Sequence, residues 1–348
     1  MSAVLAKAPA NSAAAVRLAD ALLRQSRVLN HAGLPVMAEA VLNRVLHANP
    51  SDYMARRMRA TVYLSQHRFR DALTEAKRCR ALRADDPVLD GLIGDASLEL
   101  GDYSAAFSAF DRMVLIRPDA TTYARVSYAH ELQGDLAGAI DIMTMAESAT
   151  SAHDPEAQAW HAAQLGHLHL AAGDTALARR EYLRSENLFP GYPLAGSGLA
   201  RVDMAQARPA DAIARLTKSL ETAPSAADFA LAGDAYAQLG QADSAERSYK
   251  LAEAMWTSDT PEPAQLARFL ATRGRRLDDA VRLAEEAFAV RQDIFTADAL
   301  SWAYFKQGRL DDASVAMTKA LSTGSRDPEL LSHAAAIKAA RTRPVKVR

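Results

Sequence analysis

The residues of this sequence that are best suited to chemistry are three closely spaced histidines. His161, His167 and His169 fall within one short stretch, and clustered histidines are common zinc ligands. The same stretch reads as a helix, however, where steps of six and two residues place the three rings on different faces. The spacing therefore predicts that there is no metal site.

The sequence also lacks the motifs of other catalytic or phosphate-binding sites. The run Ala195-Gly196-Ser197-Gly198 contains glycines, but no strand precedes it and no Gly-Lys-Ser/Thr follows it, as a phosphate loop requires. The sequence has no GxSxG and no HExxH motif. Its single cysteine, Cys79, cannot form an intrachain disulfide and is expected to be buried. We therefore expect a protein without catalytic residues and without a cofactor.

The element that must position any functional side chain is a helical hairpin, and residues 159–190 show it most clearly. Two apolar helical runs flank the breaker Gly173-Asp174, and Pro190 ends the second run because proline lacks an N–H and clashes with the preceding turn. Gly166 and Ala178 lie twelve residues apart, where two antiparallel helices cross. Small residues at this crossing let the backbones approach each other.

This pattern recurs in phase along the chain. Alanines follow one another at steps of about 34 residues, with one longer step before Ala178. They are Ala38, Ala72, Ala106, Ala139, Ala178, Ala212, Ala245, Ala280 and Ala313. Twelve residues before each alanine stands another small residue, except at Arg268 in the eighth repeat, where looser packing or a bend is expected.

Leu165-Gly166, Gly173, Ala178, Tyr182 and Pro190 resemble the signature of the tetratricopeptide repeat. The whole chain resembles uncharacterised bacterial proteins with many such repeats. The resemblance implies an all-α, right-handed superhelical solenoid of about nine hairpins with a C-terminal capping helix. The expected boundaries are a disordered N-terminus at 1–12, the solenoid at 13–325, the capping helix at 326–340 and a basic flexible tail at 341–348.

In this architecture the first helix of each hairpin lines the concave face, so residues eleven and eighteen positions before each alanine form the groove. Large aromatic and arginine side chains occur there, as they do at peptide-binding surfaces. The expected concave-face binding residues are Arg57, Tyr128, Trp160, His167, Arg201, Phe269, Phe295, Trp302 and Phe305. The alternative is that each ring packs against the adjacent hairpin.

The most direct hypothesis for function is a non-catalytic scaffold or adaptor that binds a protein or peptide on its concave face. Repeat proteins that clamp the C-terminal carboxylate of chaperone tails use Lys and Asn at paired groove positions, which here lie fifteen and eleven residues before each alanine. Neither position holds a Lys or an Asn in any repeat. One alternative is a nucleic-acid-associated regulator that uses the basic second repeat and the C-terminal tail. Another is the non-catalytic arm of an enzyme complex. The oligomeric state stays open.

Charge argues against the nucleic-acid alternative, because the chain is nearly neutral overall and its basic and acidic segments adjoin. Residues 1–83 carry 14 basic and 5 acidic side chains, whereas residues 84–160 carry 3 and 14. No apolar run approaches the roughly 20 residues that span a bilayer. The N-terminus shows no convincing signal peptide, so a cytoplasmic location is expected.

Overall fold

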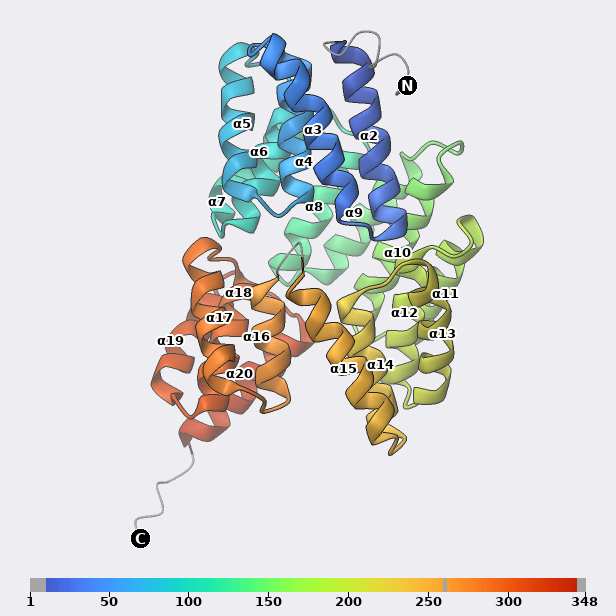
Figure 1. Ribbon diagram of the computed structural model, residues 1–348, viewed down its shortest axis with the longest axis vertical. Coiled ribbons are helices and arrows are strands. Elements are labelled where there is room, and N and C mark those ends of the chain that lie inside the picture. The colour runs from blue at the N-terminus through green and yellow to red at the C-terminus, as the bar shows by residue number, and fades with distance from the viewer. Residues whose placement is uncertain (1–10, 259–261, 343–348) are drawn as a thin grey trace.

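The chain folds as a row of helical hairpins (Figure 1). The structure is a computed structural model that describes residues 11–258 and 262–342. Nine hairpins and a final single helix make up these residues, so the predicted all-α solenoid with a capping helix is confirmed. The predicted disorder at the N-terminus and the flexible tail fall almost wholly outside the described residues.

The hairpins, in chain order, are α2 (Ser12–Leu29) with α3 (Gly33–Ala48), α4 (Tyr53–Ser65) with α5 (Phe69–Leu82), α6 (Val88–Glu99) with α7 (Tyr103–Ile116), α8 (Ala120–Leu132) with α9 (Leu136–Ser148), α10 (Pro155–Ala171) with α11 (Thr175–Leu188), α12 (Pro193–Ala205) with α13 (Pro209–Thr222), α14 (Ala226–Gln238) with α15 (Ala242–Trp256), α16 (Pro263–Thr272) with α17 (Leu277–Val290), and α18 (Ile294–Gln307) with α19 (Leu310–Ala320). The last helix is α20 (Pro328–Thr342).

The helix ends are set by local sequence. An aspartate precedes many of the helices and its carboxylate accepts a hydrogen bond from a backbone N–H of the first turn, as Asp174 does from Leu177 at 2.8 Å. Within most hairpins a glycine with positive φ turns the chain, for example Gly173 at +85°. His67 and Ala207 adopt the same left-handed conformation in the second and sixth hairpins, where a side chain is strained.

The column of alanines forms the core of the hairpins. All nine are buried, and most have no exposed surface. Two of the small residues that face them are serines whose hydroxyls donate to the alanine carbonyl: Ser127 to Ala139 and Ser301 to Ala313, each at 2.7 Å. Where the facing residue is glycine, an aromatic ring fills the space. A Cβ on Gly233 would overlap the ring of Tyr249.

Buried carboxylates pair with arginines both within hairpins and, at Asp90 and Asp203, between neighbouring hairpins. Glu75, Asp90, Glu181 and Asp203 are each at most 5% exposed, and each pairs with two or more arginines. The basic second repeat is used largely in this way, since many of its arginines pair with acidic side chains of the first three hairpins. These arginines are Arg56, Arg57, Arg59, Arg68, Arg78 and Arg80. Most arginines of this segment therefore form intramolecular ion pairs.

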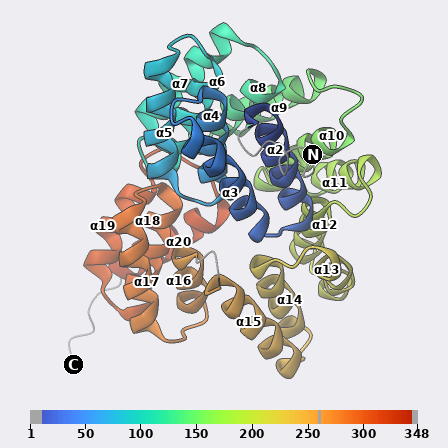
Figure 2. The ribbon, with the colours of Figure 1, turned by 45° about the horizontal axis from the view of Figure 1, so that its top comes forward.

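The solenoid curls until its C-terminal hairpins return to its N-terminal ones (Figures 1 and 2). Glu99 pairs with Arg291, and the Tyr103 hydroxyl accepts a hydrogen bond from the N–H of Ile294. Asn30 donates to the carbonyl of Pro224. These partners lie between 191 and 194 positions apart in the sequence. The expected open concave groove is therefore the inside of a ring.

The described helices include none that is both long and apolar enough to cross a membrane.

Candidate binding site

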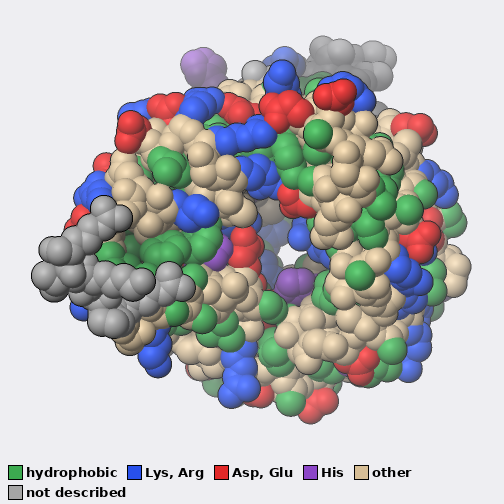
Figure 3. All heavy atoms as spheres, turned by 90° about the horizontal axis from the view of Figure 1, so that it is seen from below, with side chains coloured by type: hydrophobic (Ala, Val, Ile, Leu, Met, Phe, Trp, Pro, Cys, Tyr) green, Lys and Arg blue, Asp and Glu red, His purple; other side chains and the backbone are tan. Residues whose placement is uncertain are grey.

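The interior of the ring is hollow (Figure 3), and part of the two predicted groove columns lines it, Tyr128, Trp160 and Arg201 included. Two cavities occupy the interior. The larger, of about 890 Å³, lies among α2, α6, α8 and α10; the smaller, of about 620 Å³, lies among α2, α14 and α16. Both volumes fall in the range of about 300–1,000 Å³ that is typical of ligand sites.

Two aromatic side chains characterise the larger cavity. Tyr128 from α8 and Trp160 from α10 both line it and both are partly buried. Within residues 11–258 and 262–342, neither the Tyr128 hydroxyl nor the Trp160 indole N–H has a hydrogen-bond partner. Burial raises the pKa of Tyr128, so this hydroxyl stays protonated and can donate. Because partly buried polar groups normally find partners, the cavity offers a ligand two free hydrogen bonds beside apolar surface.

Carboxylates outnumber basic groups in the wall of this cavity. Its arginines are Arg27 and Arg125; its acidic residues are Asp95, Glu99, Asp119, Glu131, Asp154 and Glu156. Arg125 pairs with Asp95 at 2.7 Å and Arg27 with Glu156 at 3.2 Å. Burial raises the pKa of Glu99 to about 7 despite the opposing charge of Arg291. The other carboxylates of the wall also have partners just outside it: Arg117 pairs with Asp119, Arg24 with Asp154 and His167 with Glu131. Among the side chains that line the cavity, carboxylates still outnumber arginines.

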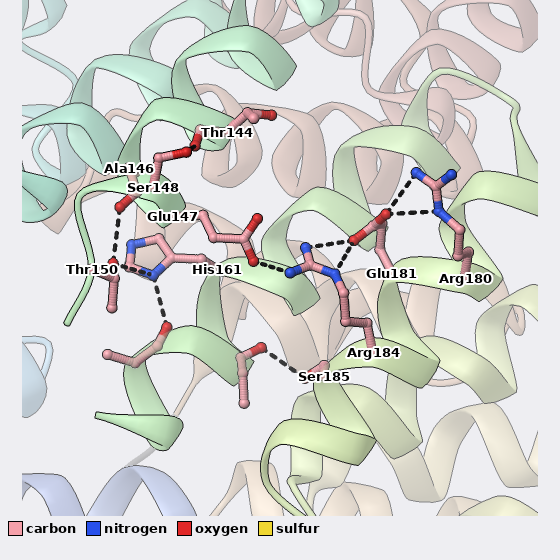
Figure 4. A network of polar contacts seen from close by, with 12 residues as sticks. Thr144, Ala146, Glu147, Ser148, Thr150, His161, Arg180, Glu181, Arg184 and Ser185 are labelled. Atoms are coloured by element: carbon pink, nitrogen blue, oxygen red, sulfur yellow. Dashed lines mark hydrogen bonds and ion pairs between the residues drawn. The ribbon is translucent and has the colours of Figure 1, made fainter. Parts of the chain in front are cut away.

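The wall is held in place by a polar network between α9, α10 and α11 (Figure 4). His161, which lines the cavity, places its Nδ1 atom 2.7 Å from the carbonyl oxygen of Ala157 and 3.2 Å from the Thr150 hydroxyl. Burial lowers the pKa of His161 and keeps the ring neutral. Arg184 bridges Glu147 and Glu181 one helix further out. These contacts fix α10, and with it Trp160.

His167 and Arg201, predicted to join Tyr128 and Trp160 in one patch, take different places. His167 is exposed, and its Nε2 atom lies 2.8 Å from Glu131. That hydrogen bond raises the pKa of His167, although burial opposes the effect. Arg201 is exposed and lines the smaller cavity. Of the four residues, Tyr128 and Trp160 line the larger cavity, Arg201 lines the smaller one, and His167 lines neither.

The predicted groove residues nearest the C-terminus, Phe269, Phe295, Trp302 and Phe305, pack mainly against neighbouring helices. Phe269 is only 4% exposed and packs against Tyr249 and Trp256 with ring centroids 5.8 and 5.1 Å away, and it also lines the smaller cavity. Trp302 stacks on His333 of the capping helix at 3.9 Å and on Phe305 at 5.1 Å.

Phe295 and Phe305 pack against an apolar cluster shared by α6–α8 and α18–α20. Arg57 pairs with Asp86 at 2.7 Å and is half-buried. Phe295 and Phe305 thus meet hairpins that are distant in sequence, whereas Phe269, Trp302 and Arg57 contact elements close to them in the chain.

Sequence reasoning missed the acidic part of the site. Glu99, Asp119, Glu131, Asp154 and Glu156 lie at helix ends or in turns, outside the two groove columns. The acidic excess of residues 84–160 was the only signal for them. No group of three or more potential ligands among the described residues could hold a metal ion.

Comparisons with known proteins agree with the fold. Residues 57–123 match the model of the tetratricopeptide repeat family. Human IFIT1 in complex with PPP-AAAA superposes with a TM-score of 0.58 at 14% identity, covering 85% of this chain and 70% of that one. A tetratricopeptide repeat protein from Parabacteroides merdae gives 0.50 at 16% identity, over 70% of this chain and 95% of that one.

The APC/C hetero-tetramer Cut9–Hcn1 gives a TM-score of 0.52 at 15% identity. The match covers 92% of this chain but only 54% of that one, so this chain spans about half the length of its counterpart. No curated protein matches the sequence. At these identities the likeness concerns the fold alone.

Proposed function

We propose that this chain, a solenoid of tandem tetratricopeptide repeats, is a non-catalytic scaffold that binds an extended segment of a client protein inside its ring. The observation that carries the proposal is the larger cavity, where Tyr128 and Trp160 present apolar surface and unpaired polar ends. Large, rigid aromatic side chains give binding area at low entropic cost.

The charge of the cavity indicates the kind of segment. Carboxylates attract Lys and Arg side chains, and the faces of Tyr128 and Trp160 accept cations as well as apolar groups. A client segment that alternates basic and apolar residues fits this wall. The Cut9–Hcn1 structure shows the same fold within a protein assembly.

Nucleic-acid binding is the second candidate, because the similar fold of human IFIT1 is seen with PPP-AAAA. Phosphates need a coherent basic face. The arginines of the second repeat are paired with carboxylates, and the larger cavity is acidic. Both features favour a basic peptide over an RNA.

Fluorescence anisotropy with three probes tests the proposal: a peptide of alternating Lys and Leu, its Glu and Leu counterpart, and a short single-stranded RNA with a 5′-triphosphate. We expect the wild type to bind the basic peptide. Trp160→Ala should weaken that binding by at least about tenfold, the loss expected for a central aromatic contact. Leu115→Ala, at a side chain 83% exposed on α7, is the matched control and should bind like the wild type.

Two outcomes would contradict the proposal. Tighter binding of the RNA, unaffected by Trp160→Ala, would favour the nucleic-acid candidate. Equal binding of the two peptides would show that the carboxylates of the cavity do not select the client.

A further inference from the structure

We propose that the contact between the two ends of the ring is a gate, which opens to admit the client segment sideways and closes around it. We call this contact the seam. On one side lie the turns between α4 and α5, α6 and α7, and α8 and α9; on the other lie the residues joining α17 to α18 and α19 to α20. The identity of the client rests on the proposed function, whereas the opening of the seam does not.

The polar contacts of the seam are few, and their side chains are partly exposed, although Ile294 itself is buried. The Tyr103 hydroxyl accepts from the N–H of Ile294 at 2.7 Å. Arg291 pairs with Glu99 at 2.5 Å, with side chains 29% and 31% exposed. Arg70 donates to the carbonyls at the end of α17, at 3.2 Å. Because water can replace such partly exposed contacts, breaking them costs little.

The apolar contacts of the seam stabilise the closed ring. One cluster holds Leu98 and Leu132 on the first side and Ile294 and Leu330 on the second. The rings packed around this cluster, Tyr103 among them, are only partly buried. The closed ring is therefore the resting state, and opening must expose side chains such as Leu132 and Ile294, which are at most 1% exposed in the closed ring.

Opening the seam leaves the hairpins intact. In a solenoid each repeat is stabilised by its neighbours in sequence. The seam joins hairpins that are not neighbours, so separating them removes none of the contacts within or between consecutive repeats. The seam can therefore open without local unfolding.

A place for the required bend is present between the seventh and eighth hairpins. Among consecutive helices in the described residues, α15 and α16 have the least backbone contact. Aromatic side chains span the gap instead, with Phe269 of α16 against Tyr249 and Trp256 of α15. A rotation here carries α16–α20 away from α4–α9 as one body.

The seam and the cavity share side chains. Glu99 lines the larger cavity and also pairs with Arg291 across the seam. Tyr128 lines the same cavity and packs on the apolar cluster that crosses the seam. A client that contacts Glu99 competes with Arg291 for this carboxylate. A client that packs on Tyr128 adds to the apolar contacts that hold the ring closed. Occupancy of the cavity and closure of the seam are coupled in this way.

Two glycines allow the seam to close. A Cβ on Gly101 would overlap the carbonyl group of Gln292, and a Cβ on Gly134 would overlap the carbonyl oxygen of Gly324. Backbone carbonyls cannot turn aside as a flexible side chain can. Gly173 and Gly240 occupy the same turn position in other hairpins with similar positive φ, and a Cβ there meets nothing within 4 Å. Alanine at these two pairs of positions imposes the same backbone strain but blocks the seam only in the first pair.

The distance across the seam, measured in the full chain, tests the proposal. Spin labels on Leu115→Cys and Val315→Cys, at side chains 83% and 74% exposed on α7 and α19, report it, since the native Cys79 is buried. The double variant Gly101→Ala/Gly134→Ala should shift the distances to longer values while its helical circular dichroism stays at that of the control. The control, Gly173→Ala/Gly240→Ala, should keep the wild-type distances.

Unchanged distances in Gly101→Ala/Gly134→Ala would overturn the gate. A loss of helix beyond that of the control would also overturn it, because the hairpins would then depend on a closed seam to stay folded. The route is tested with the Lys and Leu peptide held between two folded domains, which leaves it no free end to thread along the axis. It should bind the seam variant at least tenfold faster than the control.

Equal rates on an opened seam would show that the client enters another way and would overturn the gate. If the free peptide binds neither protein, the proposed function fails, while the distances still decide whether the seam opens.

Discussion

At the scale of single residues, the molecule depends on carboxylates that are buried and surrounded by arginines. Asp203 is the clearest case: its side chain is 1% exposed and forms ion pairs with Arg179, Arg208 and Arg215 at 2.7, 2.9 and 2.6 Å. The three arginines come from two different helices and the turn between α12 and α13. One carboxylate thereby ties the sixth hairpin to the fifth.

Removing this carboxylate should be strongly destabilising. Asp203→Ala leaves three cations close together without their counter-charge, and the loss of one partner of a buried ion pair costs about 3–5 kcal/mol. We expect the free energy of unfolding in urea to fall by that amount. Asp211, which is exposed and 3.9 Å from Arg208, is the control, and Asp211→Ala should cost less than about 1 kcal/mol. Similar losses for the two variants would contradict this role of Asp203.

The same pairs predict acid sensitivity. Burial opposes ionisation of Asp203, but hydrogen bonds from Arg179 and Arg215 outweigh it and lower its pKa; Arg184 and Arg180 act likewise on Glu181. The folded pKa values lie below the unfolded values of about 3.9 and 4.3. The pairs therefore stabilise the fold above those values, and this stability is lost as the pH falls through the folded pKa.

Thermal unfolding followed by circular dichroism should show Tm dropping below about pH 4, where these carboxylates become protonated. Asp203→Asn should have a lower Tm at pH 7 and a shallower drop in acid, because it no longer carries a titrating group at this position. An acid slope identical to that of the wild type would show that Asp203 does not contribute to it.

At the scale of the helical elements, close approach between helices is set by glycines that face aromatic rings. Two glycines of α12 separate this role from simple helix propensity. A Cβ on Gly198 would overlap the ring of Tyr182, whereas a Cβ on Gly196 would meet only Ser219, at 3.3 Å or more. Both glycines are helical, so alanine improves helix propensity equally at both.

Gly198→Ala should therefore destabilise the fold by about 1–3 kcal/mol, the cost of overpacking. Gly196→Ala should be neutral or stabilise by up to about 1 kcal/mol. Urea unfolding of the two variants measures the difference. If Gly198→Ala were as stable as Gly196→Ala, the Tyr182 ring would be free to move, and the packing role of the small-residue column would be wrong at this position.

Much of the element scale could be predicted from the sequence, because the hairpin is a local structure. The spacing of Ala38, Ala72 and their successors reports contacts only twelve residues long. The seam has no such signal: Gly101 and Gly173 occupy equivalent turns, yet only the first lies against a distant backbone. The contact of Phe295 and Phe305 with α6–α8 has no local signal either, since it forms only because the solenoid closes into a ring.

At the scale of the whole molecule, the ring makes hairpins interdependent that a linear solenoid would keep apart. Ile294 is fully buried and its N–H donates to Tyr103 across the seam. Ile294→Ala should destabilise the ninth hairpin, since such a truncation costs about 2–5 kcal/mol. Through the seam it should also reduce hydrogen-exchange protection of α6 and α7, which are far from it in sequence.

A truncation away from the seam supplies the comparison. Leu216 on α13 is equally buried, and Leu216→Ala should reduce protection in the sixth and seventh hairpins while leaving α6 and α7 unchanged. In a linear array, stability passes only between adjacent repeats, and Ile294→Ala would then loosen α16–α20 alone. Protection of α6 and α7 that does not respond to Ile294→Ala would mean that the seam carries no stability between the two ends. A response there, absent in Leu216→Ala, requires the ends to be coupled through the closed ring.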